Sequence, residues 1–383
     1  MTDAPLDGIV VADFSRVLAG PLSTMVLADL GATVIKVEHP EGGDDTRVWG
    51  PPFVGDDAAY FLGVNRNKRS LTLDLTDPDD VELARRLIAR SDVLVENFRP
   101  GVMERFGLGY DDLRAADPGL VYCSVIAFLS DEAPGDAGYD LLMQALSGFM
   151  SITGERGGGP VKIGSAILDV VAGLYLTVGL LAALRDRDRT GLGRHVEVGL
   201  FDASISALAN QAGNALLGGL VPTALGTEHP SIVPYQVFPA ADGGLALAAA
   251  NDKLFRRTCE ALGRGDLATD PDYVDNAHRV ANRDRLVAAL SAVFGTGSVA
   301  HWVEVLSAAG VPAAAVRTLD QVFESPEGRS TVVTVDDDER GDLRLVRSPW
   351  RGIGLAADQH RAPPRLGEHT DDVRAWLATE GDP

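Results

Sequence analysis

Short β-branched apolar runs alternate with longer helical patterns through the first third of the chain, and this rhythm restricts the fold more than any other feature. Strand, helix, strand in that order predicts a parallel sheet with helices on its faces, and therefore an α/β fold. In such a sheet, ligands bind outside the carboxyl ends of the strands, where loops rich in Gly, Pro, Asp and Arg follow three of the runs. The successive segments are Gly8–Phe14, Pro21–Leu30, Thr33–Val37, Asp79–Ala89, Asp92–Glu96 and Leu120–Val125.

The pattern changes near Thr227, where short strands and amphipathic helices replace the long α/β rhythm. We therefore expect a large α/β domain over residues 1–226 and a smaller domain over residues 227–330. Residues 331–383 contain a strand pair around an acidic turn and a terminal helix. We expect this last segment to return to the large domain.

Net charge limits the partners of the chain. Its 383 residues include 34 basic and 55 acidic ones, which gives a net charge of −21. A nucleic acid or an anionic membrane would meet a repulsive field, so we expect neither as a partner. An anionic small molecule would need a local basic pocket.

The compartment is indicated by two cysteines and by the first residues. Cys123 and Cys259 have neither disulfide nor metal spacing, which is typical of a reducing compartment. The start is acidic where a signal peptide needs basic residues, so we expect a cytoplasmic protein. The stretch Ala166–Leu184 is nearly long enough to span a membrane, but it carries Asp169 and no Lys/Arg asymmetry supports a span, so we expect a buried helix.

Asp169 is the most informative single residue. Apolar residues flank it on both sides, so no helical orientation gives it a wholly polar neighbourhood. Its place about one turn into the helix, with Ser165 as the expected N-cap, would help to keep the carboxylate ionised. It is a candidate nucleophile or acid–base group, and the alternative is a buried Asp that caps a neighbouring backbone.

Two other stretches have the composition of an anion-binding loop. Asn65–Ser70 (NRNKRS) holds three cations in four residues ahead of a strand-like Leu71–Leu75, and it would either cradle phosphates or form a solvated edge. Glu96–Gly101 (ENFRPG) follows a predicted strand, with Arg105 further on. Its Phe and Arg would either stack on an adenine and grip phosphates, or pack without a ligand.

Several common signatures are missing from the sequence. No GxGxxG joins a strand to a helix, and no P-loop, GxSxG, DFG or HExxH motif occurs. The seven histidines show no metal-binding spacing, so we expect no metal site.

Ten segments follow one another over nearly the whole chain: DGIVVADFSRVLAGP, LGATVIKVEHP, GDDTRVWGPP, NRNKRSLTLDL, ENFRPGVMERFGLGYDDL, GYDLLMQALSG, the helix with Asp169, TGLGRHVEVGLFDA, GVPAAAVRTLDQV and PPRLGEHTDDV. Together they resemble the family III CoA-transferases, which include formyl-CoA transferase, carnitine CoA-transferase and α-methylacyl-CoA racemase. The resemblance implies a large Rossmann-like domain plus a smaller α+β domain, in an interlocked homodimer. GDDTRVWGPPFVG and HPSIVPYQVF are most similar to the branch represented by succinyl-CoA:glutarate CoA-transferase.

Carried over residue by residue, the family's nucleophilic aspartate falls on Asp169. The resemblance implies that Asp169 attacks an acyl-CoA thioester to give a mixed anhydride, and that the released CoA then forms an aspartyl-CoA thioester. Acyl-CoA and a carboxylic acid are the implied substrates, with no tightly bound cofactor. The implied CoA-binding residues are Leu18, Ala19, His39, Leu73, Asp74, Leu75, Thr76, Asn97, Phe98, Arg99, Arg105, Ala137, Gly138, Tyr139 and Asp140.

Two other activities stay open at this point. An α-methylacyl-CoA racemase needs two proton-transfer groups, and racemases of the family have a His where this chain has Tyr139, which favours transfer. A non-catalytic CoA-binding protein would not need Asp169. For a transferase, the similarity to the glutarate branch suggests a dicarboxylic acceptor whose distal carboxylate pairs with Arg47 or His229.

Overall fold

The computed structural model describes residues 4–130 and 138–379, and the chain divides into two compact units. The large unit takes residues up to 149, residues 162–220 and residues from 330 onward. The small unit takes residues 150–161 and 221–329. The divisions near residues 220 and 330 lie close to those expected from the sequence, whereas residues 150–161 belong to the small unit instead of the large domain.

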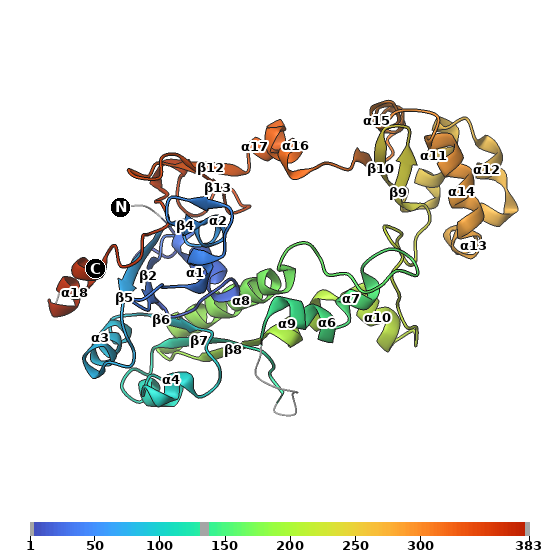
Figure 1. The fold of residues 1–383 in the computed structure, drawn as a ribbon. Coiled ribbons are helices and arrows are strands. Elements are labelled where there is room, and N and C mark those ends of the chain that lie inside the picture. The colour runs from blue at the N-terminus through green and yellow to red at the C-terminus, as the bar shows by residue number, and fades with distance from the viewer. Residues whose placement is uncertain (1–3, 131–137, 380–383) are drawn as a thin grey trace. The chain divides into compact units, whose positions relative to one another are not determined.

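A six-stranded parallel sheet forms the centre of the large unit (Figure 1). Its order is β5-β2-β1-β6-β7-β8, so the chain changes direction across the sheet between β1 and β6, as in doubly wound nucleotide-binding sheets. β1 and β6 are buried along their whole length because both faces are covered. The strands are β1 (Val10–Asp13), β2 (Thr33–Glu38), β5 (Lys68–Thr72), β6 (Val93–Glu96), β7 (Val121–Ile126) and β8 (His195–Gly199).

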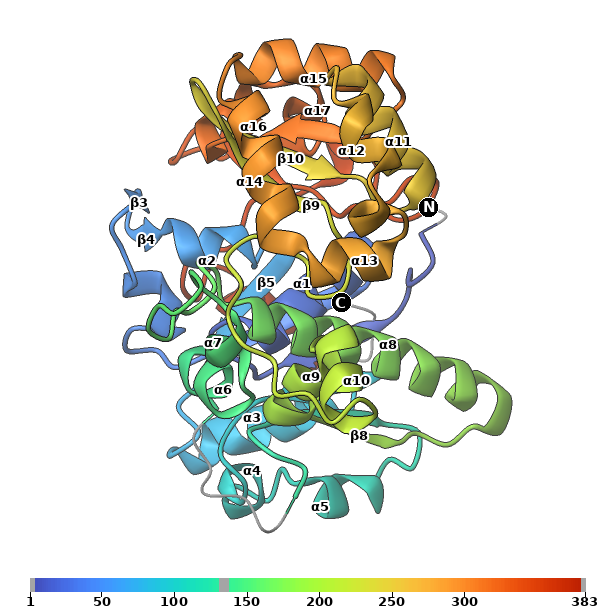
Figure 2. The ribbon, with the colours of Figure 1, turned by 90° about the vertical axis from the view of Figure 1, so that its right-hand side faces the viewer.

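Helices cover both faces of this sheet. On one face α1 (Ala19–Asp29) packs along α8 (Ile167–Thr190), and Figures 1 and 2 show the two helices side by side. On the other face lie α3 (Pro78–Ile88) and α18 (Thr370–Ala378). Gly173 allows α8 to approach α1, because a Cβ at this position would lie 2.6 Å from the carbonyl oxygen of Ala19.

α8 is long and apolar enough to cross a membrane by length and composition. Half of its apolar stretch is buried, with Leu168, Leu176 and Leu180 inaccessible in the core of the large unit. These side chains pack as those of a core helix do.

Shorter elements surround the carboxyl ends of the strands and the sheet edge. The C-terminal segment returns to edge strand β5, where the Ser70 carbonyl accepts a hydrogen bond from the His369 amide at 3.0 Å. The remaining elements of the large unit are η1 (Asp45–Val48), β3 (Phe53–Val54), β4 (Asp57–Ala58), α2 (Ala59–Gly63), α4 (Val102–Arg105), α5 (Tyr110–Arg114), α6 (Asp140–Leu146), α9 (Leu200–Ala207), α10 (Asn210–Leu216), β12 (Val332–Val335), β13 (Leu343–Val346) and η3 (Ala357–Gln359). α7 (Phe149–Ile152) begins at the last residue of one stretch of the large unit and continues into the small unit.

The small unit has its own hydrophobic core beneath an antiparallel sheet of order β11-β10-β9. Phe238, Phe294 and Trp302 lie at its centre. Its elements are β9 (Tyr235–Ala240), β10 (Gly243–Ala248), α11 (Asp252–Ala261), α12 (Gly265–Thr269), η2 (Pro271–Tyr273), α13 (Asn276–Ala281), α14 (Arg283–Phe294), α15 (Val299–Ala308), β11 (Ala313–Ala315), α16 (Leu319–Glu324) and α17 (Pro326–Arg329).

The NRNKRS stretch takes neither of the two roles expected from the sequence. Arg66 is only 1% exposed and its Nε donates to Asp29 at 2.9 Å. Lys68 begins β5, and its Nζ lies 3.0 Å from a carboxylate oxygen of the fully buried Asp13. These cations therefore neutralise buried carboxylates inside the large unit. The strand also begins three residues earlier than expected, because the paired lysine can be buried.

Candidate active site

The loops after β1 and β6 meet at the point where the strand order reverses. The Asn97 side chain joins them, because its Oδ1 accepts from the Arg16 amide at 2.8 Å and its Nδ2 donates to the Arg16 carbonyl at 2.7 Å. Asn97 thus serves the site by holding two loops together, with both polar side-chain atoms engaged. Ligand-binding loops of doubly wound sheets lie at this position.

Two neighbouring cavities open between these loops. The first, which we call the Asp169 cavity, has a volume of about 160 Å³, and the second, the His39 cavity, about 360 Å³. Arg16, Asp45 and Phe98 line both, so the two cavities adjoin. Of the residues expected to bind CoA, the Asp169 cavity is lined by Leu18, Ala19, Asn97, Phe98, Arg99, Gly138 and Tyr139, and the His39 cavity by His39, Leu73, Asp74, Leu75, Thr76 and Phe98.

Three of the expected residues fall outside this arrangement. Arg105 is exposed at the end of α4 and lines neither cavity. Asp140 also lines neither, and Ala137 lies outside the described residues. The loop residues predicted from the family resemblance are otherwise brought together around two adjoining cavities.

Asp169 lies in the first turn of α8 and is only 8% exposed. The N-cap residue of this helix is Ala166 instead of the expected Ser165, and its own side chain makes no capping hydrogen bond. Within the described part of the chain, the Asp169 carboxylate has no cationic or hydrogen-bonding partner. Burial, with a smaller contribution from the negative charge of Asp140, raises the pKa of Asp169 to about 7. The helix N-terminus therefore does not keep the carboxyl fully ionised, contrary to our expectation.

Asp140 is placed next to the start of α8 by two hydrogen bonds. Its Oδ1 accepts from the Leu168 amide at 2.9 Å, and its Oδ2 accepts from the Gln144 Nε2 at 2.6 Å. The Gln144 Oε1 in turn accepts from the Ile163 amide at 2.7 Å. Asp140 thus caps the first turn of α8 from a different helix, and places a second carboxylate near Asp169.

The structure adds two residues that sequence reasoning missed. Tyr60, on α2, is close enough to Asp169 and Asp140 for their charges to act with burial in raising the pKa of its hydroxyl to about 12. No periodic pattern marks this short helix. Arg16 lines both cavities, and its guanidinium lies 5.1 Å from the centre of the Phe98 ring. Its place as the cation directly after β1 was the available signal.

Exposed cations stand at the mouth of the two cavities. Arg16 and Arg99 line the Asp169 cavity and are exposed to solvent, and His39 lines the adjoining cavity. Arg16 lies 3.7 Å from the exposed Asp45 carboxylate, whereas Lys36, Lys68 and Arg47 are paired with buried carboxylates inside the large unit. The local positive charge that an anionic ligand needs is therefore supplied by these loops, and not by NRNKRS.

The Arg47 guanidinium is buried and paired with Glu38 and Asp57, which argues against the prediction that it binds the distal carboxylate of a dicarboxylic acid. Its Nε and Nη2 donate to Glu38 and its Nη1 to Asp57, each at 2.7 Å. Its guanidinium also lies 3.7 Å from the Phe61 ring centre. We therefore assign Arg47 to the framework beneath the site. His229 lies in the small unit, where its Nδ1 accepts from the Ser231 amide at 3.0 Å, and its role stays a prediction.

A metal-binding group is not found among residues 4–130 and 138–379, where no three His, Cys, Asp or Glu side chains cluster suitably. The arrangement is instead one of a buried, unpaired carboxylate beside loops with exposed cations. Such a carboxylate can act as a nucleophile toward an activated acyl group.

Comparisons with known proteins agree with this arrangement. The family model for CoA-transferase family III matches residues 6–370. The succinate–glutarate CoA-transferase of Agrobacterium fabrum is 41% identical, with 98% of this chain and 96% of that protein covered. Human succinyl-CoA:glutarate CoA-transferase is 38% identical, with 96% and 85% covered.

Solved structures give the same result. A CAIB/BAIF family protein from Brucella suis superimposes with a TM-score of 0.85 and 41% identity, covering 98% of this chain and 99% of that one. The matches extend over both units and include the helix that carries Asp169. The chain therefore belongs to CoA-transferase family III and is a CoA-transferase.

Proposed function

We propose that this enzyme moves CoA from succinyl-CoA, or a similar acyl-CoA, to a dicarboxylic acid, with Asp169 as the nucleophile. The observation that carries the proposal is the buried and unpaired Asp169 carboxylate in a cavity that adjoins the expected nucleotide loops. Relatives named for succinyl-CoA and glutarate, and for succinyl-CoA and mesaconate, support this choice of substrates. An acetyl-CoA:oxalate CoA-transferase at 37% identity leaves the length of the acid to experiment.

The first half of the reaction splits the donor. The Asp169 carboxylate attacks the thioester carbonyl, the C–S bond breaks, and CoA leaves as the thiolate, giving an aspartyl–acyl anhydride. The thiolate then attacks the aspartyl carbonyl and releases the donor acid as its carboxylate. An aspartyl-CoA thioester remains. Neither step needs a general base, because both nucleophiles react as anions.

The second half repeats these steps in reverse. The acceptor carboxylate attacks the aspartyl thioester and expels CoA thiolate, which then attacks the acceptor's carbonyl in the new anhydride. This restores the Asp169 carboxylate and gives the new acyl-CoA. Burial serves the reaction twice, since it makes the Asp169 carboxylate more reactive than a hydrated one and shields the anhydride from water.

Each tetrahedral intermediate carries an oxyanion that needs hydrogen-bond donors. α1 begins at Ala19 on the wall of the Asp169 cavity, and no side chain caps it. The first amides of a helix have no partner within the helix and lie at the positive end of its dipole. We assign them to the oxyanions that form beside Asp169.

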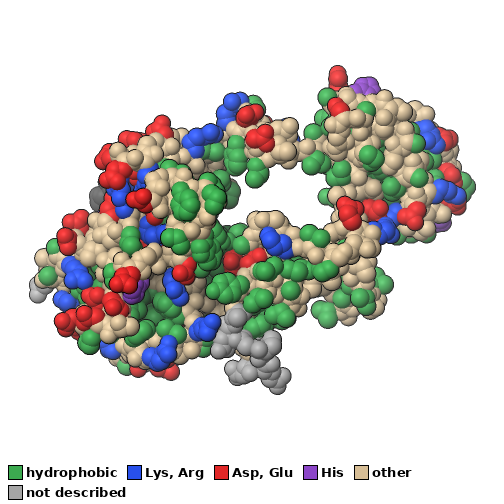
Figure 3. Space-filling model, in the orientation of Figure 1, with side chains coloured by type: hydrophobic (Ala, Val, Ile, Leu, Met, Phe, Trp, Pro, Cys, Tyr) green, Lys and Arg blue, Asp and Glu red, His purple; other side chains and the backbone are tan. Residues whose placement is uncertain are grey.

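We also propose that the enzyme is a homodimer of the cytoplasm. Apolar side chains of α8 and α10 are exposed on the single chain, with Leu216 and Leu217 at 83% and 92% exposure, which fits burial against a second copy. Figure 3 shows hydrophobic side chains gathered over α6 and α9 as well. Two buried free cysteines suit a reducing compartment. Light scattering after gel filtration gives the oligomeric state.

The direct test is to look for CoA on Asp169. The enzyme is incubated with succinyl-CoA without acceptor, quenched in acid and analysed by intact mass and peptide mass spectrometry. We expect a thioester on the peptide with Asp169, and transfer to added glutarate or another short acid. Asp169→Ala should carry no CoA and should lose turnover about 10³-fold or more.

The matched control is Asp188→Asn, a change of an exposed carboxylate at the other end of the same helix, which should keep both activities. Unchanged transfer by Asp169→Ala would contradict the mechanism. If the wild-type enzyme transfers CoA to none of the mono- and dicarboxylic acids tested, the proposed function itself is contradicted.

A further inference from the structure

Val17 is the most strained residue near the site. Its φ is +69°, in the left-handed region that β-branched residues rarely occupy, and it directly precedes Leu18 and the start of α1. Strain of this kind persists only where neighbouring groups hold the backbone in place. Two side chains, Asp44 and Asn97, hold the backbone around Val17 in place, and this backbone lines the Asp169 cavity.

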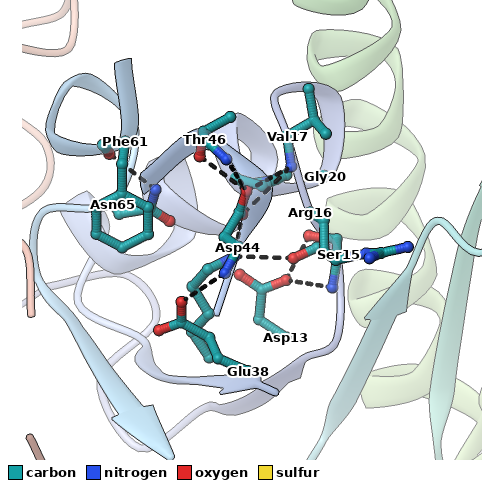
Figure 4. A network of polar contacts seen from close by, with 12 residues as sticks. Asp13, Ser15, Arg16, Val17, Gly20, Glu38, Asp44, Thr46, Phe61 and Asn65 are labelled. Carbon is teal, nitrogen blue, oxygen red and sulfur yellow. Dashed lines mark hydrogen bonds and ion pairs between the residues drawn. The ribbon is translucent and has the colours of Figure 1, made fainter. Parts of the chain in front are cut away.

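Asp44 holds Val17 from the side of β2 (Figure 4). The Val17 amide donates to its two carboxylate oxygens at 3.3 and 3.2 Å, and Asp44 also accepts from the Thr46 amide at 3.0 Å. The Lys36 ammonium lies 2.9 Å from the Asp44 carboxylate, and both side chains are wholly buried. Lys36 donates as well to the Ser15 carbonyl at 2.8 Å, so one ion pair fixes the loop at two points.

Asn97 holds the same loop from the side of β6. It bonds both the amide and the carbonyl of Arg16, the residue before Val17. A Cβ on Gly20 would lie 2.3 Å from the Ser15 Cβ, so the loop folds back on itself without room for a side chain there. The backbone from Ser15 to Gly20 is thus fixed from both sides and from within.

The fixed loop ends at the wall of the Asp169 cavity. Val17, Leu18 and Ala19 line that cavity together with Asp169, a residue that is only 8% exposed and whose carboxylate is unpaired within the described residues. The close approach of Gly173 to the Ala19 carbonyl ties α8 to the first residue of α1. The distance between the nucleophile and the first amides of α1 is therefore set by packing on one side and by the strained loop on the other.

We propose that Asp44 and Asn97 are positioning residues that hold Val17 in its left-handed conformation, and so aim the first amides of α1 at the oxyanion formed on attack by Asp169. This inference rests on the proposed function. Neither residue reacts itself. Both act through the direction of the first amides of α1, which begins at Ala19. Their loss should slow the chemical step, because misplacement by about 1 Å can cost a hundredfold in rate.

The first experiment uses two replacements of Val17 with opposite backbone preferences. Glycine adopts a φ of +69° freely, whereas proline is restricted to about −65°. The rate of aspartyl-CoA formation is measured in single turnovers at saturating succinyl-CoA. We expect Val17→Gly to stay within about threefold of the wild type and Val17→Pro to fall about a hundredfold. Equal rates for two folded variants would overturn the proposal.

The second experiment removes the Asn97 contacts, which are half-exposed, so that folding is less at risk than with the buried Asp44. Asn97→Ala should slow aspartyl-CoA formation about tenfold or more at saturating donor. The matched control is Asn67→Ala, since the Asn67 side chain also joins distant segments, through Asp29 and the Arg361 amide, and lies away from both cavities.

Circular dichroism and thermal unfolding are recorded for every variant. A control that loses melting temperature but keeps the single-turnover rate, beside a slow Asn97→Ala, supports a positioning role. Equal rates for Asn97→Ala and Asn67→Ala overturn it while leaving the proposed function intact. A wild-type enzyme that forms no aspartyl-CoA contradicts the proposed function, and the inference with it.

Discussion

Two sets of buried carboxylates lie near the ends of β1, β2 and α8, and they differ in one respect. Asp13, Glu38 and Asp44 are each within 3.0 Å of a buried Lys or Arg. Among residues 4–130 and 138–379, no cation pairs with Asp169. Burial alone would raise the pKa of every one of these groups, but Lys68 and Lys36 beside Asp13, and Lys36 beside Asp44, outweigh it. The pKa of Asp44 falls to about 2, while that of Asp169 rises to about 7.

The difference separates a structural carboxylate from a reactive one. A carboxylate that is paired with a buried cation is a poor nucleophile, because the ion pair stabilises its negative charge. One that is buried without a partner is destabilised, and that energy is available to a reaction that neutralises it, as ester or anhydride formation does. The paired set holds the loop, and the unpaired group works in the cavity that this loop lines.

Replacing Asp169 by Asn should produce the largest change: turnover should fall, whereas the free energy of unfolding should rise. Turnover should fall about 10³-fold or more. Stability should rise by up to about 4 kcal/mol at pH 8, because the folded pKa near 7 lies about three units above the unfolded value of 3.8. This cost is present above pH 7 and disappears as the pH falls toward 4. Urea unfolding at pH 8 and pH 5 measures it, and a variant that is destabilised at pH 8 would contradict the comparison.

Replacing Asp13 by Asn should have the opposite effect on stability. Asp13 is fully buried, and its removal leaves Lys68 without its carboxylate. Breaking a buried pair in this way costs about 3–5 kcal/mol. Urea unfolding at pH 7 measures the loss, with the exposed Asp188→Asn variant as the control in which no change is expected. A stability equal to that of the wild type would show that the pair contributes nothing.

The sequence predicted the parallel sheet well, because buried strands are local apolar runs. β1, β2, β6 and β7 lie within about two residues of the expected segments, and the loops after β1 and β6 meet as expected. Asp169 was also predicted, since a carboxylate inside an apolar helix is visible in the sequence itself. Most of the CoA-binding residues that the family resemblance implied line one of the two cavities.

What could not be predicted depends on partners that are distant in the sequence. We expected Lys68 and Arg47 to contact an anionic ligand, but Asp13 and Glu38 neutralise them inside the protein. Asp140 was expected to bind CoA, which stays a prediction, but its capping of α8 across 28 positions of sequence was not visible in the sequence. The sequence shows which charged residues are able to form ion pairs, and only the fold shows which of them are paired within the protein.

The smallest expected effect is the change of the single-turnover rate with pH. It tests most directly whether Asp169 differs in pKa from the paired carboxylates. Only the ionised Asp169 attacks, so with a pKa of about 7 the single-turnover rate should rise about tenfold from pH 6 to pH 8. Burial is the main cause and Asp140 the second, so Asp140→Asn should move the midpoint to lower pH. Burial also raises the pKa of Glu96 to about 7, and Glu96→Gln serves as the control that should keep the wild-type midpoint. A midpoint that follows Glu96 would assign the profile to the nucleotide loop, and a flat profile would mean that the bound donor restores an ordinary pKa to Asp169.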